Sequence, residues 1–192
     1  MDDIIDLSNR VHKLNQQWWH DAAGQPLQRN PGELIALVHS ELSEGYMGWL
    51  SKEQDDHLPD HPMVHVELVD AYIRILDYVG GFGLQDQIQE PYRAAIATVS
   101  PYRNTFYDMS GHETFARLQS MASSWLEYTR KNDQEAALIA IACLMISILQ
   151  FAQVIGLGHT AFMDCLEEKL FYNQQRADHK LANRLLAGGK KF

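Results

Sequence analysis

Two acidic segments, Glu41-Leu-Ser-Glu44 and Glu67-Leu-Val-Asp70, carry most of the information in this sequence. Each stretch has two acids at positions i and i+3, which a helix places on one face, one turn apart. Both pairs continue apolar helical stripes. The apolar neighbours are Leu34, Leu37 and Val38 for the first pair, and Met63, Val64, Ala71 and Ile75 for the second. We therefore expect two facing helices that direct carboxylates into the interior of an all-α bundle.

Four acids inside a helical bundle need a partner of opposite charge. Buried carboxylates repel one another and lose their hydration, which is costly unless a cation compensates. Mg²⁺ and Mn²⁺ prefer carboxylate oxygens, so the sequence predicts a metal site formed by Glu41, Glu44, Glu67 and Asp70. One i, i+3 acid pair alone is common on solvated helix faces, but two pairs on apolar stripes favour metal. A di-iron bundle would need Glu-x-x-His motifs, and this sequence has none.

Length and charge restrict the class of protein. The chain has 192 residues and a net charge of −9, which predicts one domain or two small similar halves. The negative charge argues against general affinity for nucleic acid or an anionic membrane. Cys143 and Cys165 lack metal-type spacing and are expected to be reduced thiols of a cytosolic protein. The acidic start of the chain lacks the basic region of a signal peptide.

Helical periodicity recurs along the whole chain, and strand signals are nearly absent. The expected helices cover 3–20, 31–49, 62–80, 84–99, 113–130, 133–155 and 160–175, and a basic tail covers 176–192. The segment 136–158 has no charged residue, but its uninterrupted apolar part ends at Leu149, which is short for a bilayer crossing. We therefore expect a buried central helix there and an all-α bundle as the fold.

A weak internal repeat relates two parts of the chain. The segment 76–84 aligns with 149–157 at an offset of 73 residues, which places Glu67 on Ala140 and Asp70 on Cys143. On this interpretation, 1–192 is a single domain with a metal-binding half at about 1–100. The second half, about 112–175, would be a degenerate copy that has lost its ligands.

The acidic motifs resemble those of the MazG-like, all-α nucleoside triphosphate pyrophosphohydrolases, a superfamily that includes dimeric dUTPases and dCTPases. The resemblance extends to Arg29-Asn30-Pro-Gly-Glu33 and to the tail segments YNQQRADHK at 172–180 and GGKKF at 188–192, which look like phage and bacterial members. Pro91 to Asp133 is the least similar part. The chain has Ser40 where longer MazG enzymes commonly carry another Glu, which affects the expected number of metal ions.

The resemblance implies hydrolysis of a nucleoside triphosphate to the monophosphate and pyrophosphate, with Mg²⁺ or Mn²⁺ held by the four acids. It implies that Lys169, Asn173, Arg176 and Lys180 contact the phosphates or the metal site, on the side opposite the acids. Spacing alone would make these four residues a basic helix end. The resemblance also implies a homodimer or larger assembly, in the cytoplasm, or in the host cytoplasm for a phage protein.

Candidate base contacts lie near the N-terminus. Asn15 belongs to a Leu-Asn segment similar to one that helps to read the base in dimeric dUTPases, and Trp18 or Trp19 could stack on a base. Paired tryptophans are otherwise common as core anchors.

The preferred nucleotide stays open between dGTP or GTP and a narrow pyrimidine choice, as in a dUTPase or dCTPase. A non-catalytic helical interaction module with a relic metal site is the other class. Arg74 and Asp77 share the face of Asp70, either supporting the site or pairing with each other.

Overall fold

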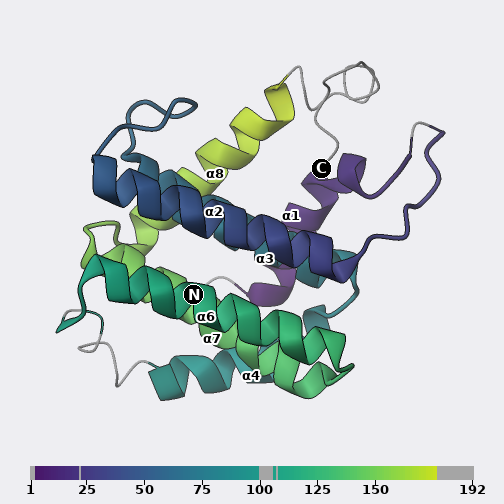
Figure 1. The fold of residues 1–192 in the computed structure, drawn as a ribbon. Coiled ribbons are helices and arrows are strands. Elements are labelled where there is room, and N and C mark those ends of the chain that lie inside the picture. Colours follow the sequence, from purple (N-terminus) through teal and green to yellow (C-terminus); the bar gives the residue numbers. More distant parts are fainter. Residues whose placement is uncertain (1–2, 22, 100–105, 107, 177–192) are drawn as a thin grey trace.

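The computed structural model describes residues 3–21, 23–99, 106 and 108–176, and within them the chain is all-α, with no β-strand (Figure 1). The α-helices are α1 (Ile4–Leu14), α2 (Pro31–Ser51), α3 (Met63–Gly81), α4 (Gln85–Val99), α6 (Gly111–Arg130), α7 (Gln134–Val154) and α8 (His159–Gln175). A 3₁₀ turn, η1 (Gln16–Trp18), follows α1. The predicted fold class is therefore confirmed.

Local signals explain where the helices begin. Pro31 opens α2, and the Asn30 side chain accepts a hydrogen bond from the Gly32 backbone at 2.9 Å. Ser110 and Glu113 form a reciprocal capping box at the start of α6. Asp133 caps α7 by accepting a hydrogen bond from the backbone of Ala136 at 3.1 Å. These caps agree with the helix positions expected from the sequence.

The first helix is shorter than its sequence pattern suggests. We expected a helix over 3–20, but α1 ends at Leu14 and the chain leaves helical geometry at Asn15. The Trp19 carbonyl then accepts a hydrogen bond from the Leu27 backbone at 2.8 Å, so the chain has already turned back at this point. The apolar periodicity continues to Trp18 because the turn itself is packed into the core.

Two helical hairpins make up most of the bundle. α2 packs along α3, and α6 packs along α7, while α2 also contacts α6 (Figure 1). A Cβ atom at Gly48 would lie 2.8 Å from the Val64 backbone nitrogen, so this glycine permits the close approach of α2 to α3. The proposed internal repeat would relate these two hairpins and stays a prediction.

α7 is a core helix. It is long and apolar enough to cross a membrane by length and composition, yet 67% of its most apolar window is buried by the rest of the chain. α3, α4, α6 and α8 all contact it. This burial is typical of the central helix of a soluble protein and agrees with the expectation for this segment.

α8 and α1 both pack against α3, which brings the two ends of the described chain to the helix that carries Glu67 and Asp70.

Candidate metal centre

Three of the four predicted acids meet between α2 and α3. One carboxylate oxygen from each of Glu41, Glu67 and Asp70 lies within 4.8 Å of the other two. Glu41 and Glu67 are buried, with 8% and 6% of their surface exposed. Glu44 is exposed and lies at the edge of this group, where it accepts a hydrogen bond from the Ser40 hydroxyl at 3.1 Å. Glu41, Glu67 and Asp70 are called the acid cluster below.

Two basic side chains contact the acid cluster directly. The Arg74 guanidinium donates from Nε to Glu41 Oε1 at 3.0 Å, and the Lys169 ammonium lies 2.9 Å from Asp70 Oδ2. Burial lowers the pKa of Lys169, but the charge and hydrogen bond of Asp70, together with the charges of Asp55 and Glu67, raise it above its ordinary value, so Lys169 stays protonated. Lys169 was expected on the side opposite the acids and instead lies among them. Arg74 pairs with Glu41, whereas a pair with Asp77 was one of the two expectations.

Glu67, in contrast, has one carboxylate oxygen without a hydrogen-bond partner in the described part of the chain. Its Oε2 is buried and has no hydrogen-bond partner among the residues that the structure describes. Burial, followed by the charges of Asp70 and Glu41, raises the pKa of Glu67 to about 9. A buried carboxylate oxygen without a hydrogen-bond partner destabilises a fold. Together with the two neighbouring carboxylates, however, it forms a suitable set of ligands for a hard divalent cation. The residues present therefore fit Mg²⁺ or Mn²⁺.

The raised pKa of Glu67 predicts how the metal-free protein responds to pH. The ordinary value is 4.5 and the folded value is about 9, so between them the unfolded chain loses a proton that the folded chain keeps. The free energy of unfolding should therefore decrease as pH rises through this range. Thermal unfolding of metal-free wild type beside Glu67→Gln tests this, because the variant lacks the ionising group. Parallel pH profiles for the two proteins would contradict it.

A cavity of about 190 Å³ joins the acid cluster to residues from distant parts of the sequence. Most of the predicted site residues line it: Asn15, Trp18, Glu41, Glu44, Glu67, Asp70, Lys169, Asn173 and Arg176. Trp19 is not among the lining residues; it is buried, and its indole N–H donates to Asp77. Lys180 lies outside the described residues. The cavity thus has an acidic wall from α2 and α3, a basic wall from α8 and a wall from the turn after α1.

His57 also lines the cavity, and the sequence analysis did not identify it. It lies on the loop between α2 and α3, where the Asp55 carboxylate accepts hydrogen bonds from the backbones of His57 and Leu58 at 2.9 and 2.8 Å. Burial, with the nearby charges of Lys169 and Arg176, lowers the pKa of His57. A neutral imidazole near two cations offers a hydrogen bond without adding a charge. No helical spacing marks this residue, so only the folded loop reveals it.

A larger cavity, of about 350 Å³, lies elsewhere between the end of α3, the start of α4 and the turn from α6 to α7. Its acid, Asp133, already caps α7, and a single carboxylate does not form a multidentate metal site. Volume alone would favour this cavity. The chemistry of the lining favours the smaller one, where acids and bases converge.

Comparison with known proteins adds no relative. No protein family, curated protein or solved structure matches this chain. The functional argument therefore depends on the site itself.

Proposed function

We propose that this protein is a metal-dependent nucleoside triphosphate pyrophosphohydrolase, which converts an NTP or dNTP to the monophosphate and pyrophosphate. One observation carries the proposal: a single cavity combines the acid cluster with Lys169, Asn173 and Arg176 of the last helix region. A triphosphate is strongly anionic, and a chain of net charge −9 must neutralise it locally. The resemblance of the acidic motifs to MazG-like enzymes points to the same reaction.

The acids divide into two roles. Glu41, Glu67 and Asp70 would hold Mg²⁺ or Mn²⁺, which when bound would neutralise phosphate charge and lower the pKa of a water that it binds. Glu44 is exposed at the edge of the acid cluster and is therefore the acid best able to accept a proton from an attacking water. Arg74 orients Glu41 through its hydrogen bond from Nε.

The basic wall suits the phosphate chain. Arg176 presents a guanidinium, which binds phosphate oxygens directionally, and the Asn173 amide can donate a further hydrogen bond. Lys169 is held by Asp70 in the described structure, so its ammonium links the acidic and basic walls. His57, which lines the same cavity and is influenced by the charges of Lys169 and Arg176, adds a neutral donor. The leaving pyrophosphate would occupy this region.

The part of the cavity lined by the turn after α1 suits a base. Asn15 carries a donor and an acceptor, and Trp18 supplies an aromatic surface. Both dGTP or GTP and a narrow pyrimidine nucleotide, as for a dUTPase or dCTPase, are compatible with these groups. We propose a cytoplasmic enzyme, in the host cytoplasm for a phage protein, without nucleic-acid or membrane partners.

A second candidate is a non-catalytic helical module that retains the cluster as a polar network. The ion pairs of Arg74 with Glu41 and of Lys169 with Asp70 favour it, because they neutralise two acids without metal. The unsatisfied Oε2 of Glu67 argues against it. A screen of all natural NTPs and dNTPs with Mg²⁺ or Mn²⁺ separates the candidates. The proposal expects monophosphate and pyrophosphate from at least one nucleotide, whereas no product from any of them would support the module.

The basic end of the cavity gives a prediction of its own. Truncation after Asn173 removes Arg176 and the rest of the basic tail and should lower kcat/KM about tenfold or more, equivalent to about 1.4 kcal/mol of transition-state stabilisation. Metal affinity should change little, because the acids lie on other helices. Steady-state kinetics with the best nucleotide measures the effect. Arg130→Gln, which removes an exposed cation paired with Glu127, is the matched control. Full activity of the folded, truncated chain would contradict a role of the removed segment in catalysis.

We also propose a homodimer or larger homo-oligomer. The apolar composition of α7 gives only weak support, because other helices of the same chain cover most of it. Large apolar side chains are nevertheless exposed on α2 and α8: Met47, Leu50 and Phe171. Light scattering at micromolar concentration should give at least twice the mass of 21.9 kDa. A monomeric mass would contradict the proposal.

A further inference from the structure

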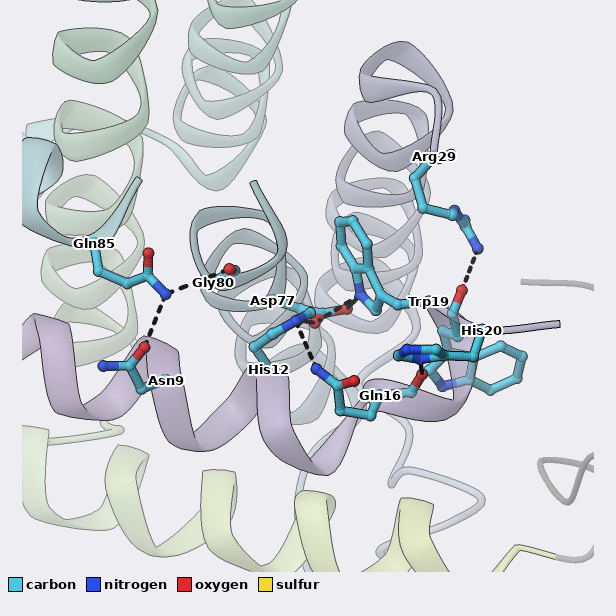
Figure 2. A network of polar contacts seen from close by, with 10 residues as sticks. Asn9, His12, Gln16, Trp19, His20, Arg29, Asp77, Gly80 and Gln85 are labelled. Carbon is cyan, nitrogen blue, oxygen red and sulfur yellow. Dashed lines mark hydrogen bonds and ion pairs between the residues drawn. The ribbon is translucent and has the colours of Figure 1, made fainter. Parts of the chain in front are cut away.

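A buried carboxylate ties the turn after α1 to the helix that carries the metal ligands (Figure 2). Asp77 is 7% exposed and accepts hydrogen bonds from Trp19 Nε1, at 3.1 Å to each oxygen, and from His12 Nδ1 at 2.9 Å. Asp77 lies two helical turns after Asp70 on α3, so both carboxylates belong to one rigid element. We call His12, Trp19 and Asp77 the turn anchor.

Further contacts hold the same turn from other sides. The Gln16 side-chain nitrogen lies 2.8 Å from His12 Nε2. Because an amide N–H can only donate, His12 Nε2 accepts, and the imidazole carries its proton on Nδ1, which faces Asp77. The His20 ring contacts the Gln16 carbonyl at 2.9 Å. On the outer side, Arg29 donates to the Trp18 carbonyl at 2.8 Å (Figure 2). The backbone between Asn15 and Trp19 is therefore fixed at both ends.

The packing leaves little freedom for this anchor. A Cβ atom at Gly81 would lie 2.0 Å from Trp19 Cζ2, so the indole lies directly on the backbone of α3. The ring also meets Phe82 edge to face, with centroids 5.4 Å apart. Trp19 therefore packs against the end of α3, while its neighbour Trp18 lines the cavity.

We propose that His12, Trp19 and Asp77 are positioning residues that hold Asn15 and Trp18 at the cavity and so determine which nucleobase is accepted. Within the described residues, the hydrogen bonds of the turn anchor go to none of the cavity-lining acids, and Trp19 contributes through Trp18 instead of by stacking on a base. The inference rests on the proposed function. Its physical basis is that base selectivity needs recognition groups held in fixed geometry, while the metal and phosphate walls come from other helices.

The test uses Asp77→Asn and Trp19→Phe in the full-length chain. Both donors to Asp77 need an acceptor, so an asparagine amide places an N–H against one of them. Trp19→Phe removes the indole donor but keeps an aromatic ring, and it serves if Asp77→Asn does not fold. Hydrogen exchange should become about tenfold faster at the amides of Trp18 and Trp19, with α2 unchanged. KM for the best nucleotide should rise and selectivity between bases should fall, each about fivefold, with kcat within about twofold.

Glu167→Gln is the matched control. Glu167 of α8 pairs with Arg10 of α1, the helix that also carries His12, but both side chains of this pair are exposed. It should change neither exchange at the turn nor selectivity. Unchanged selectivity in a variant whose turn exchanges faster would overturn the inference, and so would an unchanged turn in both variants. A wild-type chain that hydrolyses no nucleotide would instead overturn the proposed function. In that case hydrogen exchange still tests whether the turn anchor holds the turn, but the claim about base selectivity would be wrong.

Discussion

Glu67→Gln is expected to lower kcat/KM by about three orders of magnitude, an effect comparable with the loss of a central electrostatic group in other active sites. Glu67 is the acid whose Oε2 has no hydrogen-bond partner within the described residues. If that oxygen is a metal ligand, an amide in its place supplies a much weaker one. Steady-state kinetics with the best nucleotide measures the loss.

The same variant should retain the stability of the metal-free fold. With a pKa of about 9, Glu67 is largely protonated near neutral pH, and glutamine resembles that neutral form in size and shape. The melting temperature without metal should therefore be equal to or above that of wild type. Glu90→Gln, which removes an exposed acid paired with Arg93, is the control for loss of a charge. A clear fall in melting temperature only in Glu67→Gln would indicate a structural polar network.

Removal of divalent metal is expected to abolish hydrolysis completely, and addition of Mg²⁺ or Mn²⁺ to restore it. The sequence predicted this because four acids inside a helical bundle need a partner of opposite charge. The structure corrects the reason, because Arg74 and Lys169 contact Glu41 and Asp70. These two cations pair with Glu41 and Asp70 and leave the buried Oε2 of Glu67 without a hydrogen-bond partner among the described residues, so we still expect a need for metal.

The measurement is turnover in excess EDTA, followed by titration back with each metal. Circular dichroism on the same samples shows whether the chelated protein keeps its helices. Full turnover in EDTA would rule out a metal-dependent reaction. Loss of helix on chelation would mean that the metal holds the fold as well as the site.

The sequence predicted the helices well because their signals are local. Pro31, the Ser110–Glu113 box and Asp133 mark helix starts by contacts within a few residues, and the helices begin within two residues of the positions expected from the sequence. The acid spacing likewise determined which carboxylates share a face. Three of them meet within 4.8 Å because α2 and α3 pack side by side.

The remaining features depend on contacts between distant segments. Apolar periodicity does not distinguish a helix from a turn that is packed on the core, so the end of α1 at Leu14 was missed. Trp18 and Trp19 are equivalent in sequence, and only the buried Asp77 on α3 separates their roles. His57 reaches the cavity through a loop, and Lys169 reaches Asp70 from α8. No spacing rule connects residues so far apart along the chain.

Direct titration with Mn²⁺ tests the central claim, that Glu41, Glu67 and Asp70 form a divalent-metal site. Electron paramagnetic resonance of free Mn²⁺ gives the number of ions bound per chain without any need for a substrate. Wild type should bind at least one ion, Glu67→Gln should bind about tenfold or more weakly, and Glu90→Gln should match wild type. Equal binding by wild type and Glu67→Gln, or no binding by either, would contradict the account.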